Sequence, residues 1–181
     1  MVLGRRPSLP DGTHFVKAMF RDRMAELVGD ASQTFFDRVM IARYPDFVEV
    51  RTHGNIGDLT ADGLRLDSGR PYACYARLSL IPRTHKVESK FHSDLTGAKA
   101  KRRGEFKTFV FVFNHQRGGM HPEVSRVLAQ AQIDHAPLTF EALGPKHLLA
   151  EVLRLDRHEI EEVFGAPIQA EDVVYGVGLR T

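Results

Sequence analysis

The order of the predicted elements indicates an α/β fold with a mixed central sheet flanked by helices. Two helical segments come first, a β-hairpin follows, and the rest of the chain alternates helices with strands. The segment Phe106–Asn114 is almost continuously apolar, which is typical of a strand covered on both faces. Together these three observations predict helices on both sides of one sheet.

Two helices are predicted in the first part of the chain. Residues 1–12 carry glycine, proline and arginine and are expected to form a flexible lead-in. Apolar residues at helical spacing predict a helix over Phe15–Val28, which Gly29 would end. Ser32 is a favourable N-cap for a second helix with one apolar side, and Pro45 would end that helix.

A β-hairpin is predicted next. The segment Phe47–Thr52 has a β-branched core and predicts a strand, and a glycine-rich turn then leads to a short strand over Asp62–Leu66. Serine and glycine within Asp67–Arg70 supply the backbone freedom of a hairpin turn. The strand Pro71–Leu78 is expected to return antiparallel to the one before it.

Helices and strands alternate after the hairpin. A long helix is predicted over Thr84–Arg102, and Pro122 opens another helix that runs to about Ile133. The long helix has a buried stripe formed by Val87, Phe91, Leu95 and Ala98.

The last predicted elements are a strand and two helices. Leu138–Leu143 is expected to be another buried strand, and Pro145 opens the following helix. Asp156 and Glu159 form a capping box for a final helix that stops at Gly165.

Composition fits one globular domain, expected over residues 13–167 with a C-terminal tail at 168–181. The 181 residues are 43% hydrophobic, which is enough to bury a core. A formal charge of +2 neither requires nor excludes DNA as a partner. A single cysteine, Cys74, excludes an internal disulfide and is expected to lie in the core. No apolar run approaches 18 residues and the opening lacks a signal-peptide core, so we expect no membrane association and a cytoplasmic location.

The segment Gly54–Gly63 carries the most specific motif, because its glycine-rich turn delivers Asp62 to the start of the hairpin. The second hairpin strand, with Cys74-Tyr75-Ala76, would then cross the same position. This pattern resembles the PD-(D/E)xK nuclease superfamily, and within it the nuclease-like components of bacterial ABC three-component defence systems. The resemblance extends over Phe35–Gly165, and its other motifs are Arg43–Phe47, Lys90–Ala98 and Phe109–Asn114.

The resemblance implies a restriction-endonuclease-like sandwich and a magnesium-dependent phosphodiesterase site. A divalent ion polarises the phosphoryl oxygen and lowers the pKa of bound water. Asp62 matches the metal-binding aspartate, whereas Ala73 stands where glutamate or glutamine would be and Tyr75 where lysine would be. Ala73 cannot bind a metal and Tyr75 supplies no positive charge. The resemblance therefore implies weak, altered or lost nuclease activity.

Other residues can replace the missing groups. Lys90 precedes the buried Phe91 and can project over the sheet edge toward Asp62, while Asp58, Glu49 or Asp94 can supply a second carboxylate. Lys90 can equally be a solvated residue on an exposed helix face. We name Asp62, Tyr75 and Lys90 as catalytic candidates, and Asp62 and Asp58 as ligands for magnesium.

Basic residues gather along the same helix and suggest contact with DNA. Some of these side chains can instead stabilise the helix C-terminus electrostatically. The candidate phosphate-binding strip, called the basic strip below, consists of Lys86, Lys99, Lys101, Arg102 and Arg103. The expected partners are DNA and either a protein of a defence complex or a second copy of the chain. The alternative function is a non-catalytic protein-interaction subunit built on a nuclease-like fold.

Overall fold

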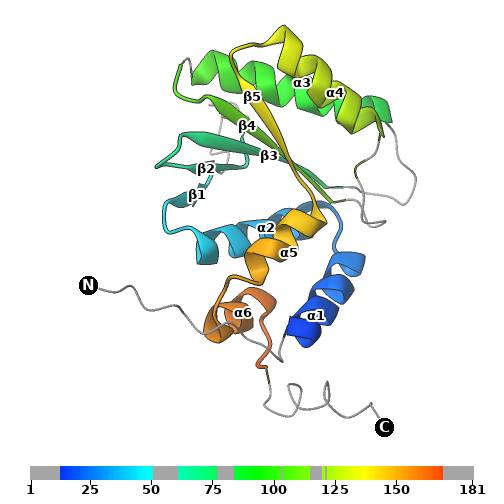
Figure 1. Cartoon of the computed structure of the whole chain (residues 1–181), viewed down its shortest axis with the longest axis vertical. Helices are drawn as coiled ribbons and strands as arrows, with labels where there is room; N and C mark the ends of the chain where they lie inside the picture. The colour runs from blue at the N-terminus through cyan, green and yellow to red at the C-terminus, as the bar shows by residue number, and fades with distance from the viewer. Residues whose placement is uncertain are drawn as a thin grey trace.

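The computed structural model describes residues 13–50, 61–76, 84–102, 104–114, 120 and 122–168. Within these residues a five-stranded mixed sheet lies between two layers of helices (Figure 1). This arrangement confirms the prediction of an α/β fold with a mixed sheet flanked by helices.

The sheet has the order β1-β2-β3-β4-β5. Strands β1 (Phe47–Glu49), β2 (Gly63–Arg65) and β3 (Arg70–Ala76) form an antiparallel meander. Strands β4 (Thr108–Asn114) and β5 (Thr139–Leu143) run parallel to β3. The sheet therefore changes from antiparallel to parallel at β3, whose carboxyl end lies beside those of β4 and β5.

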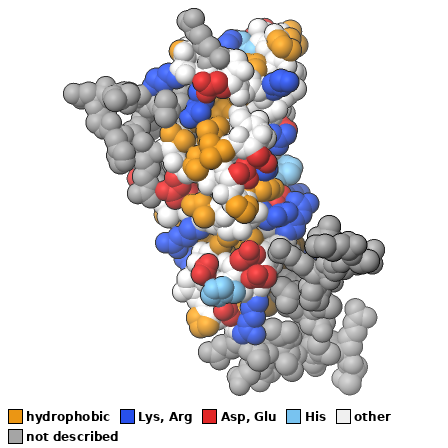
Figure 2. Space-filling view, turned by 90° about the vertical axis from the view of Figure 1, so that its left-hand side faces the viewer, with side chains coloured by type: hydrophobic (Ala, Val, Ile, Leu, Met, Phe, Trp, Pro, Cys, Tyr) orange, Lys and Arg blue, Asp and Glu red, His pale blue; other side chains and the backbone are white. Residues whose placement is uncertain are grey.

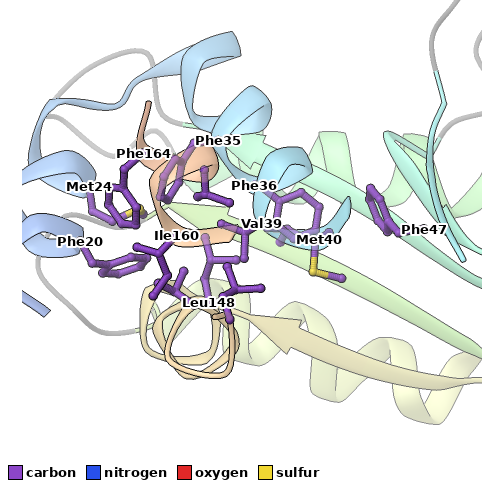
Figure 3. Close-up of a cluster of buried hydrophobic side chains, with 14 of the residues drawn as sticks. Phe20, Met24, Phe35, Phe36, Val39, Met40, Phe47, Leu148, Ile160 and Phe164 are labelled. Carbon is purple, nitrogen blue, oxygen red and sulfur yellow. The ribbon is translucent and has the colours of Figure 1, made fainter. Parts of the chain in front are cut away.

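Four helices form the layer on one face of the sheet (Figure 1): α1 (Thr13–Glu26), α2 (Gly29–Arg43), α5 (Pro145–Val152) and α6 (Arg157–Phe164). Their apolar side chains converge with those of β1 and β3 in one buried cluster (Figure 3). Phe35 meets Phe164 edge to face at 5.4 Å, and Phe36 packs against Phe47 at 5.9 Å. Aromatic contacts thus join the first helices to the last helix and to the sheet.

Helices α3 (Thr84–Lys101) and α4 (Pro122–Asp134) cover the opposite face of the sheet (Figure 1). The ring of Phe91 in α3 stands perpendicular to Phe109 at 5.9 Å and to Phe111 at 5.6 Å. Leu95 and Ala98 are also buried on this side of α3, so most of the predicted apolar stripe holds the helix against β4.

Two local predictions were wrong. Helix α1 ends at Glu26, and α2 begins at Gly29 with Val28 as its N-cap, so Ser32 lies buried inside the helix instead of capping it. Strand β5 is not buried as expected, because it forms the edge of the described sheet and its side chains alternate between exposed and half-buried. Its apolar residues pack on both faces, Phe140 and Ala142 toward α3 and α4 and Leu143 toward the opposite cluster, but each is only half-buried.

Turn and cap signals were more accurate. Gly69 in the hairpin turn has φ of +60°, and a Cβ there would lie 2.5 Å from the carbonyl oxygen of Glu105. The predicted capping box is present, because Asp156 accepts from the Glu159 N–H at 2.9 Å and Glu159 accepts from the Asp156 N–H at 2.7 Å. Among the described residues, no helix is both long enough and apolar enough to cross a membrane.

Candidate functional site

Asp62 lies immediately before β2, where that strand separates from β3. Its backbone N–H donates to the Tyr72 carbonyl at 2.7 Å, although Tyr72 also pairs with Gly63. The Asp62 carboxylate accepts a hydrogen bond from the Cys74 N–H at 2.5 Å. The side chain thus takes the place of a main-chain acceptor and joins the start of the hairpin to its second strand.

Ala73 and Tyr75 lie on either side of Cys74 along β3 and face the layer of α3 and α4. Ala73 is fully buried, and Tyr75 stacks on Phe111 with ring centroids 6.3 Å apart. Cys74 belongs to the opposite cluster, because alternate residues of a strand face opposite sides, and its burial confirms that it lies in the core. Neither residue that faces α3 supplies a carboxylate or a cation.

Lys90 carries the cationic group of this region. Its ammonium group lies 2.9 Å from the Asp94 carboxylate one turn along α3. Burial alone would lower the pKa of Lys90, but the hydrogen bond and charge of Asp94, with the charge of Asp62, raise it above its usual value. Lys90 therefore remains protonated at neutral pH and can stabilise negative charge, but it cannot act as a general base.

The pKa of the Cys74 thiol reflects the charged groups around it. Burial raises the pKa of its thiol well above the usual value, the charges of Asp62 and Asp37 raise it further, and Lys90 lowers it. Asp37 is a buried residue of α2 that sequence analysis missed. The signal was present, because an aspartate between Phe36 and Met40 interrupts an otherwise apolar helix side.

Acidic groups predominate around Cys74: the charges of Asp62, Asp37 and Asp94 each raise the pKa of its thiol, whereas that of Lys90 lowers it. Even so, no group of three histidine, cysteine or acidic residues in the described part of the chain could hold a metal ion. Asp58, the second predicted ligand, lies outside the described residues. The described side chains therefore do not by themselves fit a magnesium ion.

The Arg43–Phe47 motif supports the fold. Arg65 Nε lies 3.1 Å from the Asp46 carboxylate, and its guanidinium sits 4.1 Å from the centre of the Tyr44 ring. Burial would raise the pKa of Asp46, but hydrogen bonds from Arg65 and Asp67 hold it at about 2. These contacts fix the turn between α2 and β1 to strand β2.

The basic strip is only partly described. Lys99 and Lys101 occupy the last turn of α3, and Arg102 follows directly. The side chain of Lys86 and the whole of Arg103 lie outside the described residues. Lys99 and Arg102 line one cavity near the end of α4, about 380 Å³ in volume.

Asn114 ends β4 at the carboxyl edge of the sheet. Its amide donates to the Leu27 carbonyl at 2.8 Å, which ties β4 to the connection between α1 and α2. The adjacent cavity measures about 20 Å³, room for about one water molecule. Asn114 therefore serves packing at this edge, and the cavity is too small for a substrate.

Comparison with known proteins adds no relative: no protein-family model, curated protein or solved structure matches the chain. The resemblance to PD-(D/E)xK nucleases accordingly stays a prediction from the sequence motifs. Function must be inferred from these residues.

Proposed function

We propose that the chain is a nuclease-like, DNA-related domain of a bacterial anti-phage or mobile-element defence system, with weak, altered or lost phosphodiesterase activity. The observation that carries the proposal is that α3, the helix of Lys90, packs against β3, whose Cys74 N–H holds the Asp62 carboxylate; the negative charge of Asp62 accordingly helps to raise the pKa of Lys90. An aspartate at the start of a hairpin, with a cation supplied from the following helix, is the arrangement expected for a displaced nuclease lysine.

The proposed loss of activity follows from the residues that β3 carries at the catalytic positions. Ala73 offers no ligand, and Tyr75 is packed on Phe111 where the resemblance requires lysine. A protonated Lys90 would stabilise charge on a phosphate, but the surrounding carboxylates repel the same phosphate unless a cation is bound. Activity in this proposal therefore depends on ligands such as Asp58 that lie outside the described residues.

Nuclease assays test the catalytic part of the proposal. Purified protein is incubated with supercoiled plasmid and with single-stranded DNA in the presence of Mg²⁺ or Mn²⁺. We expect weak or no cleavage, and Asp62→Ala should abolish whatever cleavage is present. Robust cleavage that survives Asp62→Ala would contradict the assignment of the site. If Asp62→Ala abolishes robust cleavage, loss of activity in folded Lys90→Ala would give Lys90 the displaced lysine's role.

DNA binding tests the second part. Phosphate contacts carry no base information, so binding by the basic strip should be insensitive to sequence and should weaken steeply with salt. Fluorescence anisotropy with short duplex and single-stranded oligonucleotides at low and moderate salt measures both properties. Absence of binding to either form at low salt would contradict a nucleic-acid function.

One observation favours the alternative, a non-catalytic protein-interaction subunit. Val48 of β1 and Leu66 after β2 are large apolar residues with 38% and 61% of their surface exposed. Figure 2 shows hydrophobic side chains gathered along the middle of the side that contains this hairpin. Because β1 is the edge of the described sheet, a protein partner could cover these side chains. Failure of both the nuclease and the binding assays would favour this function.

A further inference from the structure

A second cavity lies away from Asp62, where the end of α3 meets the connection between α4 and β5. Its volume is about 380 Å³, within the range of small-molecule sites. Its polar side chains come from two segments of the chain, Lys99 and Arg102 on one side and Asp134 and His135 on the other. Apolar Phe106 and Pro137 complete the wall.

The contact between Lys99 and His135 creates a hydrogen-bond donor. The Lys99 ammonium lies 3.1 Å from His135 Nδ1. A protonated lysine has only hydrogens to offer, so Nδ1 is the acceptor in this contact and the ring N–H lies at Nε2. The pair therefore presents the remaining ammonium hydrogens and one imidazole N–H to an acceptor.

Arg102 is held in place but weakly neutralised. Its side chain is only 14% exposed, and within the described part of the chain it forms an ion pair with Glu105, 3.8 Å away on a mostly exposed side chain. The Nε atom is buried with no hydrogen-bond partner among the described residues. At this distance, and with Glu105 exposed to solvent, the pair neutralises the guanidinium charge only weakly.

The acidic group in the wall does not cancel these charges. Asp134 accepts a hydrogen bond from Gln130 at 2.8 Å, which satisfies part of its carboxylate within α4. Lys99 and Arg102 thus supply two positive charges against one negative charge among the lining residues. An anion is the ligand that this charge balance favours.

We propose that this cavity binds a single phosphate group, carried by a nucleotide or by the end of a nucleic-acid strand. Arginine, lysine and an imidazole N–H are suited to an oxygen-rich anion that accepts several hydrogen bonds. The volume exceeds what inorganic phosphate needs and leaves room for an attached sugar. Binding of a strand end, but not of a free nucleotide, rests on the proposed nucleic-acid function.

Calorimetric titration of the full chain tests the cavity with inorganic phosphate and with adenosine monophosphate. The test variant is Lys99→Met, because Lys99 both donates to the ligand and sets the His135 tautomer. Lys107→Met is the matched control, since Lys107 is an exposed lysine outside the cavity wall. Loss of one charge-assisted contact should weaken binding about tenfold or more in Lys99→Met and leave the control unchanged. Arg102→Lys keeps the positive charge but loses the paired N–H donors of the guanidinium group, so it should also weaken binding.

A second titration compares oligonucleotides that differ only in a 5′-phosphate or a 5′-hydroxyl. Tighter binding of the phosphorylated strand, lost in Lys99→Met, would identify the strand end as the source of the phosphate. Binding of phosphate and nucleotide without binding of either strand would support the cavity and contradict the nucleic-acid function. Strand binding that ignores both the 5′-phosphate and Lys99→Met, with no binding of free phosphate, would overturn the cavity proposal and leave the nucleic-acid function standing.

Discussion

The two halves of α3 present opposite electrostatic environments. Near Lys90, carboxylates outnumber the ammonium group, since Asp94, 2.9 Å away, and Asp62 both raise the pKa of Lys90 through their negative charge. At the end of the same helix, the cavity wall carries Lys99 and Arg102 against Asp134, and Glu105 faces Arg102 from outside the wall at 3.8 Å. The first region favours a cation, and the second favours an anion.

The difference separates binding from catalysis on one helix. A phosphate can approach the cavity at the end of α3 without help, whereas it is repelled near Asp62 unless a cation is bound there. In the proposed function, loss of metal-dependent activity is therefore compatible with binding of nucleic acid. The largest effect is expected from a substitution that removes the packing of α3 on β4, which both regions share. Substitutions that change a single charge should have smaller effects.

Phe91→Ala should have the largest effect. Phe91 is 1% exposed and joins α3 to β4 through Phe109 and Phe111, so its loss leaves a cavity beneath both halves of the helix. We expect the free energy of unfolding to fall by about 3–5 kcal/mol, measured by urea denaturation. The control Ile133→Ala removes an exposed apolar side chain of α4 and should change it by less than about 0.5 kcal/mol. Similar losses in both variants would mean that α3 is not anchored through Phe91.

The packing of α3 on β4 was predicted correctly from the sequence, because the residues that repeat at the expected spacing are also the buried ones. The stripe containing Phe91 and Leu95 repeats at helical spacing, and Phe106–Asn114 is apolar at nearly every position. The prediction failed where a neighbour decides the outcome, as for Ser32, displaced from the cap when α2 began at Gly29. Strand β5 failed for the same reason, since a sheet edge cannot be identified from one strand's own residues.

Asp62→Ala should have an intermediate effect. The Cys74 N–H would lose its acceptor, and an unsatisfied buried amide costs about 1–3 kcal/mol. Asp62→Asn keeps an oxygen acceptor and should lose less, although it also removes the charge. Urea denaturation gives the difference, and the alkylation rate of Cys74, the single cysteine, reports local opening. Equal losses in both variants, with unchanged alkylation, would show that this hydrogen bond does not hold Asp62 in place.

The candidate sites were less predictable than the packing of α3 on β4. Asp62 and Lys90 were selected from motif order alone, and their proximity depends on how α3 crosses the sheet. His135 was missed because it reaches Lys99 across 36 positions of the chain, and no local pattern signals that contact. Asp37 could be recognised in the sequence as a charge on an apolar helix side, but its effect on Cys74 could be found only from the fold.

Lys90→Met and Lys99→Met should have the smallest effects on stability, and only Lys90→Met should lower it. Lys90→Met leaves Asp94, only 13% exposed, without its ammonium partner, and we expect a loss of up to about 1 kcal/mol. Lys99→Met removes a cation that shares the cavity wall with Arg102, but it also removes the exposed contact with His135, so stability should stay about unchanged. Thermal unfolding at low and high salt measures both, and salt should shrink the effect of Lys90→Met through screening. Equal destabilisation by the two variants at low salt would show that the two halves of α3 do not carry opposite charge balances.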